Sequence, residues 1–160
     1  MVNRPLLELK KRLRGKVVIV GIGNTLRGDD GAGPKLIEQL KNSQLLTLSS
    51  KLSLISVGEV PENYLAKIAE HKPDTIMLVD AVDFGSEPGS VRVIEQDALK
   101  EESFFSHNAS LKLTISYLRK TTKGLVFLLG IQPTKNLKIG SGLSKPVKQA
   151  IKRCITAVSQ

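Results

Sequence analysis

The sequence predicts an α/β protein in which buried, mostly parallel strands alternate with helices. Three apolar runs, residues 17–20, 75–79 and 125–131, lack the regular polar alternation of a strand with one face in water. Uninterrupted runs of this kind are typical of strands that helices cover on both faces. A polar or glycine-rich loop follows each run, and amphipathic patterns lie between the runs. Strands that alternate with helices along the chain indicate a mostly parallel sheet.

Size and composition fit a single domain over residues 1–160. The chain has 160 residues, 41% of them hydrophobic, which suffices for a full core. No apolar run approaches the roughly 20 residues that span a bilayer, and the basic segment 1–16 lacks the apolar core of a signal peptide. We therefore expect a soluble, cytoplasmic protein with no membrane partner. Cys154 is the only cysteine, which excludes an internal disulfide and a cysteine-based zinc site.

The formal net charge of +9 is unevenly distributed along the chain. Residues 111–160 contain ten lysines and arginines and no aspartate or glutamate. Such a segment suits nucleic acid, a membrane surface or an acidic protein. Aromatic residues make up only 4% of the chain and do not alternate with the basic residues, so the pattern does not favour nucleic acid. We expect a solvated face or a surface for an acidic protein partner.

Local patterns predict the remaining elements. The link at residues 86–89 is too short for a crossover helix, so the strand after it should run antiparallel to the strand before it. Cys154 falls on the apolar stripe of the last helix, which indicates a core position. The expected elements are a short amphipathic helix within the basic N-terminal appendage 1–16, a helix from about 31–34, a strand at 52–57, a helix at about 64–71, a strand at 90–95, a helix containing Leu111, Ile115 and Leu118, and a helix from Pro146 to about Val158.

The loop after the first strand, residues 21–34, combines glycines with two adjacent carboxylates. It offers only two glycines of the dinucleotide-binding pattern, because Leu26 occupies the place of the third. Asp29 and Asp30 would also repel a pyrophosphate at the helix start. The loop has no Gly-Lys-Ser/Thr sequence, which excludes a P-loop. A cation therefore suits this loop better than a phosphate.

Three residues could form a cation site at one edge of the sheet. Asp30, Asp80 and His107 each follow a predicted strand or precede a predicted helix. Two carboxylates and an imidazole leave coordination positions open for water or substrate, as a reactive metal site requires. Structural roles fit the same residues: Asp30 could cap a helix, Asp80 could accept from loop N–H groups, and His107 could be a polar residue at a helix end.

Three segments, residues 21–33, 79–89 and 106–108, together resemble the nickel-iron hydrogenase maturation endopeptidases in sequence, order and spacing. The similarity extends over nearly the whole chain. The sequence Gly-Asp-Asp-Gly at 28–31 and Val-Pro-Glu-Asn at 60–63 are most similar to the hydrogenase 3 subgroup. The basic segment before Val17 lies outside the family pattern.

This resemblance implies a fold, an activity and a site. The fold is a three-layer α/β/α sandwich of the phosphorylase/hydrolase-like kind, with a mixed, mostly parallel five-stranded sheet. The activity is removal of the C-terminal extension of a hydrogenase large-subunit precursor after nickel insertion. The family's two acids correspond to Asp30 and Asp80, which would be catalytic, and its histidine corresponds to His107. All three would contact nickel that the substrate precursor supplies.

Several alternatives remain open at this point. The protein could hold its own divalent metal, such as zinc, and act as an ordinary metallopeptidase. It could instead be a non-catalytic metal- or nucleotide-binding assembly chaperone. Asp29 or Asp83, or one of the metal-contacting pair, could be the general base. The glycines of the first loop would leave clearance for a substrate's tail, and the candidate substrate-binding residues are Gly23, Asn24, Glu62 and Gln132, although Asn24 also suits a turn and Glu62 a helix end.

Overall fold

The computed structural model describes residues 4–44, 50–95, 98, 109–135 and 138–159. Within this part of the chain, five strands form one sheet in the order β2-β1-β3-β5-β4. The first, second, third and fifth strands are parallel to one another, and β4 is antiparallel to β5. The mixed, mostly parallel sheet is therefore confirmed. The strands are β1 (Val17–Ile22), β2 (Leu52–Gly58), β3 (Thr75–Ala81), β4 (Val91–Glu95) and β5 (Leu125–Ile131).

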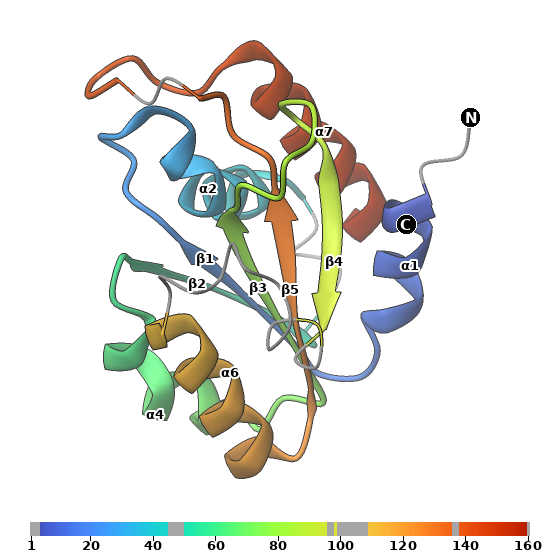
Figure 1. Cartoon of the computed structure of the whole chain (residues 1–160). Helices are drawn as coiled ribbons and strands as arrows, with labels where there is room; N and C mark the ends of the chain where they lie inside the picture. The colour runs from blue at the N-terminus through green and yellow to red at the C-terminus, as the bar shows by residue number, and fades with distance from the viewer. Residues whose placement is uncertain (1–3, 45–49, 96–97, 99–108, 136–137, 160) are drawn as a thin grey trace.

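Helices cover both faces of the sheet and complete the three layers (Figure 1). One layer contains α1 (Arg4–Arg12), α2 (Ala32–Asn42) and α7 (Lys145–Ser159). The opposite layer contains α4 (Leu65–Glu70) and α6 (Ala109–Thr122). Two short 3-10 helices, η1 (Gly28–Gly31) and η2 (Pro61–Tyr64), lead into α2 and α4. The expected α/β/α sandwich is confirmed. No helix of the described residues has both the length and the apolar character needed to cross a membrane.

Each face of the sheet packs against its own hydrophobic cluster. In β3, Met77 and Val79 face the α1, α2 and α7 layer, whereas Ile76 and Leu78 face the α4 and α6 layer. All four side chains are fully buried. Burying a side chain of this size stabilises the fold by roughly 1.5–3 kcal/mol. Burial on both faces explains why these strands are continuous apolar runs.

The structure differs from the sequence prediction at the end of β3. The strand was expected to end at Val79, but it continues through Ala81 because Asp80 pairs with Gly130 of β5. The polar side chain of Asp80 resembles the start of a loop, although its backbone still belongs to the sheet. The fourth strand runs antiparallel to β3 as expected, but it pairs with β5 rather than with β3.

The basic N-terminal segment is more than an appendage. Leu9 of α1 is fully buried in the same cluster as residues of α2 and α7. Arg12 forms an ion pair with Glu95 of β4, and its guanidinium carbon lies 5.7 Å from the ring centroid of Phe127. Cys154 is buried as predicted, and burial raises the pKa of its thiol to about 12. The thiol therefore stays protonated within the core.

Candidate functional site

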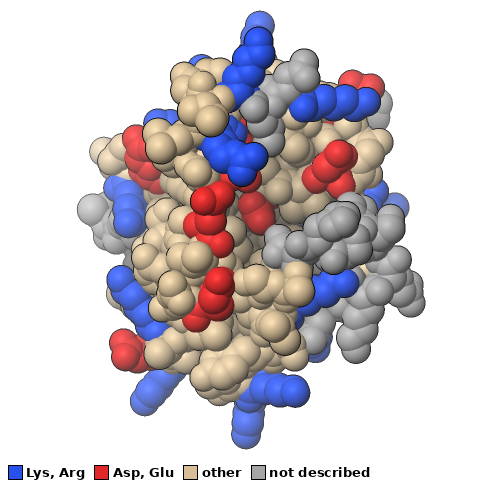
Figure 2. Space-filling model, turned by 60° about the vertical axis from the view of Figure 1, so that its left-hand side comes forward, with Lys and Arg blue, Asp and Glu red and all other residues tan. Residues whose placement is uncertain are grey.

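The carboxyl ends of β1, β2, β3 and β5 meet at one edge of the sheet, as the parallel pairing requires. This edge lies toward the upper left of Figure 1. Ligands of open α/β sheets bind beyond this edge. Figure 2 shows acidic side chains gathered in a band through the middle of one face, with basic side chains above and below it. The carboxylates that directly follow these strands are Asp29, Asp30, Glu59, Glu62 and Asp83, and Asp80 lies at the end of β3.

The structure brings Asp30 and Asp80 together. Asp80 is only 7% exposed, and Asp30 lies half-buried in η1. Burial, followed by repulsion from the Asp30 carboxylate, raises the pKa of Asp80 well above its ordinary value of 3.8, against a smaller opposing effect of the Ala81 N–H. Two like charges in a partly water-excluded site are stabilised by a cation or by a shared proton. The pair is therefore suited to bind a cation.

The third predicted member, His107, lies outside the described residues. Among the residues that the structure does describe, no group of three His, Cys, Asp or Glu side chains could hold a metal ion. The donor chemistry of the described pair nevertheless fits a divalent ion, because carboxylate oxygens suit nickel or zinc when an imidazole completes the set.

Gly23 and Asn24 hold Asp30 in place. Gly23 has a φ of 138°, and a Cβ at this position would overlap the backbone carbonyl oxygen of Asp30. The Asn24 N–H donates to Oδ2 of Asp30 at 2.9 Å, while Oδ1 of Asn24 accepts from the Leu26 N–H at 2.9 Å. The predicted turn role of Asn24 is confirmed. Both residues, expected to bind substrate, contact the chain that positions Asp30.

Other glycines of this loop also serve internal packing. A Cβ on Gly21 would lie 2.6 Å from the carbonyl oxygen of Gly33. A Cβ on Gly33 would overlap the carbonyl oxygen of Ile22 and lie 2.5 Å from that of Val79. The start of α2 can therefore approach the ends of β1 and β3 closely. The expectation that these glycines provide clearance for a substrate's tail is wrong for Gly21 and Gly33, because the space is filled by the protein itself.

Asp29 has a structural role that sequence reasoning missed. It is 1% exposed, and its carboxylate accepts four hydrogen bonds. The donors are the N–H and hydroxyl of Thr134, at 2.9 and 2.8 Å, and those of Ser144, at 2.7 and 2.9 Å. Burial raises the pKa of Asp29, but the hydrogen bonds together outweigh it, so the net pKa lies below 3.8. A carboxylate with four donors is a poor candidate for the general base.

Gln132 shapes the loop that follows Asp80. Its side chain is 4% exposed, and its Oε1 accepts from the Phe84 and Ser86 N–H groups at 2.8 and 3.2 Å. Its Nε2 donates to Oδ1 of Asp83 at 3.0 Å and to the Pro133 carbonyl at 3.3 Å. The bond from Gln132, followed by that from the Gly85 N–H, holds the pKa of Asp83 below its ordinary value. These contacts favour a positioning role over direct substrate contact.

Glu62 lies exposed in η2, at the end of β2 and its loop. Its Oε2 accepts a hydrogen bond from the hydroxyl of Ser110 at 2.8 Å. Ser110 belongs to the first turn of α6, so this bond joins η2 to the start of that helix. Glu62 therefore acts as the acid at a helix start while remaining accessible at the same edge as Asp30. His71, the other histidine, lies at the end of α4 near Ser53 and away from this edge.

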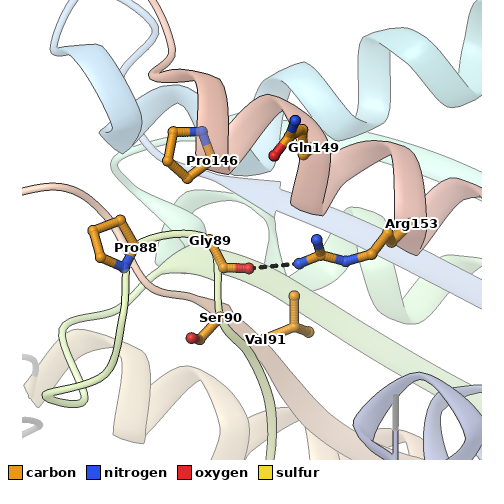
Figure 3. A pocket seen from close by; sticks show the side chains of 7 residues that line it. All are labelled: Pro88, Gly89, Ser90, Val91, Pro146, Gln149 and Arg153. Carbon is orange, nitrogen blue, oxygen red and sulfur yellow. Dashed lines mark hydrogen bonds between the residues drawn. The ribbon is translucent and has the colours of Figure 1, made fainter. Parts of the chain in front are cut away.

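A separate cavity of about 530 Å³ lies between α7 and the start of β4 (Figure 3). Nη2 of Arg153 donates to the Gly89 carbonyl at 2.8 Å, which anchors the β3–β4 connection on α7. A Cβ on Gly89 would lie 2.6 Å from the carbonyl oxygen of Pro146. The described residues that line this cavity include no carboxylate, unlike the site at Asp30 and Asp80. Its lining residues are Pro88, Gly89, Ser90, Val91, Pro146, Gln149 and Arg153.

Comparisons with known proteins agree with this fold. The family model for hydrogenase maturation protease (HycI) matches residues 34–160. The chain is 35% identical over 144 residues to the hydrogenase 3 maturation protease of Escherichia coli K12, covering 89% of this chain and 86% of that protein. The crystal structure of the [NiFe] hydrogenase maturation protease HycI from Thermococcus kodakarensis KOD1 has a TM-score of 0.83 and 32% identity, covering 95% and 96% of the two chains.

The solution structure of the endopeptidase HycI from Escherichia coli gives a TM-score of 0.76 at 32% identity, over 88% of this chain and 87% of that one. The fold and these similarities define the class of the protein, which is an endopeptidase. More particularly, the chain belongs to the hydrogenase maturation protease family, and its similarity is to the hydrogenase 3 type.

Proposed function

We propose that this protein removes the C-terminal extension of a nickel-iron hydrogenase large-subunit precursor after nickel has been inserted. Asp30, Asp80 and His107 would contact the nickel in the precursor and so place the scissile bond beside the site. The name of the Escherichia coli relative, a hydrogenase 3 maturation protease, supports a hydrogenase precursor as the substrate. Nickel is then part of the substrate and not a resident cofactor.

The observation that carries this proposal is the buried carboxylate pair. Burial and the charge of Asp30 both disfavour the ionised form of Asp80. A cation that arrives with the substrate would relieve both effects at once, because it neutralises the repulsion and replaces lost solvation. Precursor without nickel offers no such gain. The same pair therefore distinguishes a loaded precursor from an empty one.

The described residues also narrow the choice of general base. Asp29 is occupied by four hydrogen-bond donors, and Asp83 is held by Gln132 and Gly85. A carboxylate oxygen of the Asp30–Asp80 pair that is not itself bound to nickel is better placed to accept a proton from the attacking water. Gly23 and Asn24 would contribute by fixing Asp30.

The direct test compares purified precursor with and without nickel. We expect the protein to cleave the loaded precursor and to leave the nickel-free precursor intact. Asp30→Asn and Asp80→Asn should each lower the cleavage rate by more than about 100-fold, because even residues behind metal ligands commonly contribute 10–100-fold. Glu87→Gln is the matched control, since Glu87 is an exposed carboxylate in the loop after β3. Equal cleavage of both precursors would refute nickel recognition.

Two further measurements separate the alternatives. Stoichiometric zinc in protein purified without added metal would favour a resident-metal peptidase over recognition of substrate nickel. Asp80→Asn protein that still binds the loaded precursor but no longer cleaves it would support an enzyme rather than an assembly chaperone. Unchanged cleavage by this variant would remove Asp80 from the active site.

A further inference from the structure

A groove runs between α2 and α7 on the layer opposite α4 and α6. Two cavities, of about 400 and 450 Å³, both use Gln39 and Lys152 in their walls, so they adjoin each other along the two helices. We call the two together the α2–α7 groove. Its walls are formed by Thr25, Gly28, Gly31, Lys35, Glu38, Gln39, Asn42, Ser43, Gly142, Leu143, Lys148, Lys152, Ile155 and Thr156.

The α2–α7 groove carries an excess of positive charge. Among the described residues, three lysines line it, against the single carboxylate of Glu38. That carboxylate is paired with Lys35 at 3.0 Å. Lys148 and Lys152 lie one helical turn apart on the exposed surface of α7. Neither lies within ion-pair distance of a carboxylate in the described part of the chain. Two cations are thus available to a ligand.

One end of the groove reaches the loop that carries Asp30. Gly28 and Gly31, which flank Asp29 and Asp30, are part of its wall. Beside this end, the side chains of Leu26 and Ile139 are 68% and 83% exposed. The Gly140 N–H donates to the Leu26 carbonyl at 2.9 Å and holds the two loops together. Two large apolar side chains exposed next to each other offer an apolar surface that a protein partner could cover.

We propose that the α2–α7 groove docks an acidic segment of the hydrogenase precursor, while Leu26 and Ile139 contact apolar side chains of the same partner. This inference rests on the proposed function and extends it to substrate recognition. The groove follows α2, whose 11 residues span about 16 Å, the length of about five extended residues. Its positive charge is complementary to carboxylates, and its continuity with the Asp30 loop would direct the bound chain toward the site.

Binding to a catalytically inactive protein tests the docking proposal. In an Asp80→Asn background, K148E/K152E should weaken binding of nickel-loaded precursor by about tenfold or more and reduce its dependence on salt. The control K67E/K120E makes the same change of charge at exposed lysines of α4 and α6, and it should bind within about twofold of the parent. Circular dichroism would verify that both variants are folded.

Kinetics of the otherwise unmodified enzyme provide the second readout. K148E/K152E and Leu26→Ser/Ile139→Ser should raise KM while kcat at saturating precursor stays unchanged, because the groove contributes binding rather than chemistry. If K148E/K152E behaves like K67E/K120E while the enzyme cleaves normally, docking in the groove is refuted and the proposed function stands. If the unmodified protein neither binds nor cleaves the precursor, both fail. A further outcome is that a short RNA displaces the precursor, with K148E/K152E losing affinity for the RNA and for the precursor to the same extent. That result would indicate that the groove binds nucleic acid instead.

Discussion

Oδ2 of Asp29 accepts a hydrogen bond from the hydroxyl of Thr134 at 2.8 Å, although the two residues are 105 positions apart. The same carboxylate also accepts hydrogen bonds from the N–H and the hydroxyl of Ser144. The loop after β1 is thereby joined to both ends of the segment between β5 and α7. Asp29 and Asp30, adjacent in the sequence, have separate tasks: the first fastens this loop to the fold, and the second meets Asp80.

Replacing Asp29 tests this fastening. Asp29→Ala should lower the free energy of unfolding by about 3 kcal/mol at about pH 7, because the four partly buried donors of Thr134 and Ser144 lose their acceptor. The pKa of Asp29 lies below 3.8 in the folded protein, so its stabilisation exists above that pH and is lost as the pH falls through the folded pKa. Urea titrations should show the difference from wild type shrinking below pH 3.8. A difference that does not change with pH would contradict an ionised Asp29.

Asp80 should have the opposite effect on stability. Its folded pKa is raised above 3.8 by burial and by Asp30, so the fold is favoured at low pH and loses stability as the pH rises through the folded pKa. Asp80→Asn removes this loss. We expect the variant to be more stable than wild type at about pH 7 and to converge with it below 3.8. Parallel stability curves for the two proteins would count against the shift.

Gly23→Ala should lower the activity by more than a general loss of fold stability would explain. The added Cβ overlaps the Asp30 carbonyl and also strains a φ of 138°, so Asp30 must move. We expect a loss of at least about tenfold in kcat/KM, because small displacements of catalytic groups are costly. Gly58→Ala is the control: Gly58 also has a positive φ, but a Cβ there has nothing within 4 Å. Equal activity of the two variants would show that Gly23 does not position Asp30.

Gln132→Leu should disturb the loop after β3 in a way that NMR can detect. The change removes the donor to Asp83 and the acceptor for the Phe84 and Ser86 N–H groups. We expect the pKa of Asp83 to rise toward its ordinary value and the free energy of unfolding to fall by about 2 kcal/mol. Comparison with Asp83→Asn in the same titration identifies the NMR resonance of Asp83. An unchanged Asp83 pKa would show that Gln132 does not govern it.

The sequence predicted the strands best where burial on both faces leaves a local pattern. The apolar run ending at Ile131 coincides with β5, and the run from Thr75 identifies β3 except for its last two residues. Asp80 could not be assigned to the strand from the sequence, because its pairing with Gly130 is a tertiary contact. Its polar side chain also resembles the start of a loop. Likewise, the burial of Leu9 under α7 depends on packing and not on the helical pattern of its own segment.

The site was predictable only in part. The proximity of Asp30 and Asp80 follows from the rule that parallel strands end at one edge of the sheet. The clamp at Asp29 was not predictable, because no local pattern reports partners 105 and 115 positions away. The position of Gln132 after β5 indicated that it lies at this edge of the sheet. Its side chain is buried, however, so it contacts the loop after β3 and not solvent. The place of His107 in the site stays a prediction, since this residue lies outside the described part of the chain.

The Asp29 clamp also bears on the order in which parts of the fold can form. Asp29 leaves the ribosome early, but Thr134 and Ser144 follow only after more than a hundred further residues have been added. During that interval the loop that presents Asp30 lacks the partners that fix it. A nascent chain therefore contains Asp30 and Asp80 before Thr134 and Ser144 can fix the loop that carries Asp30.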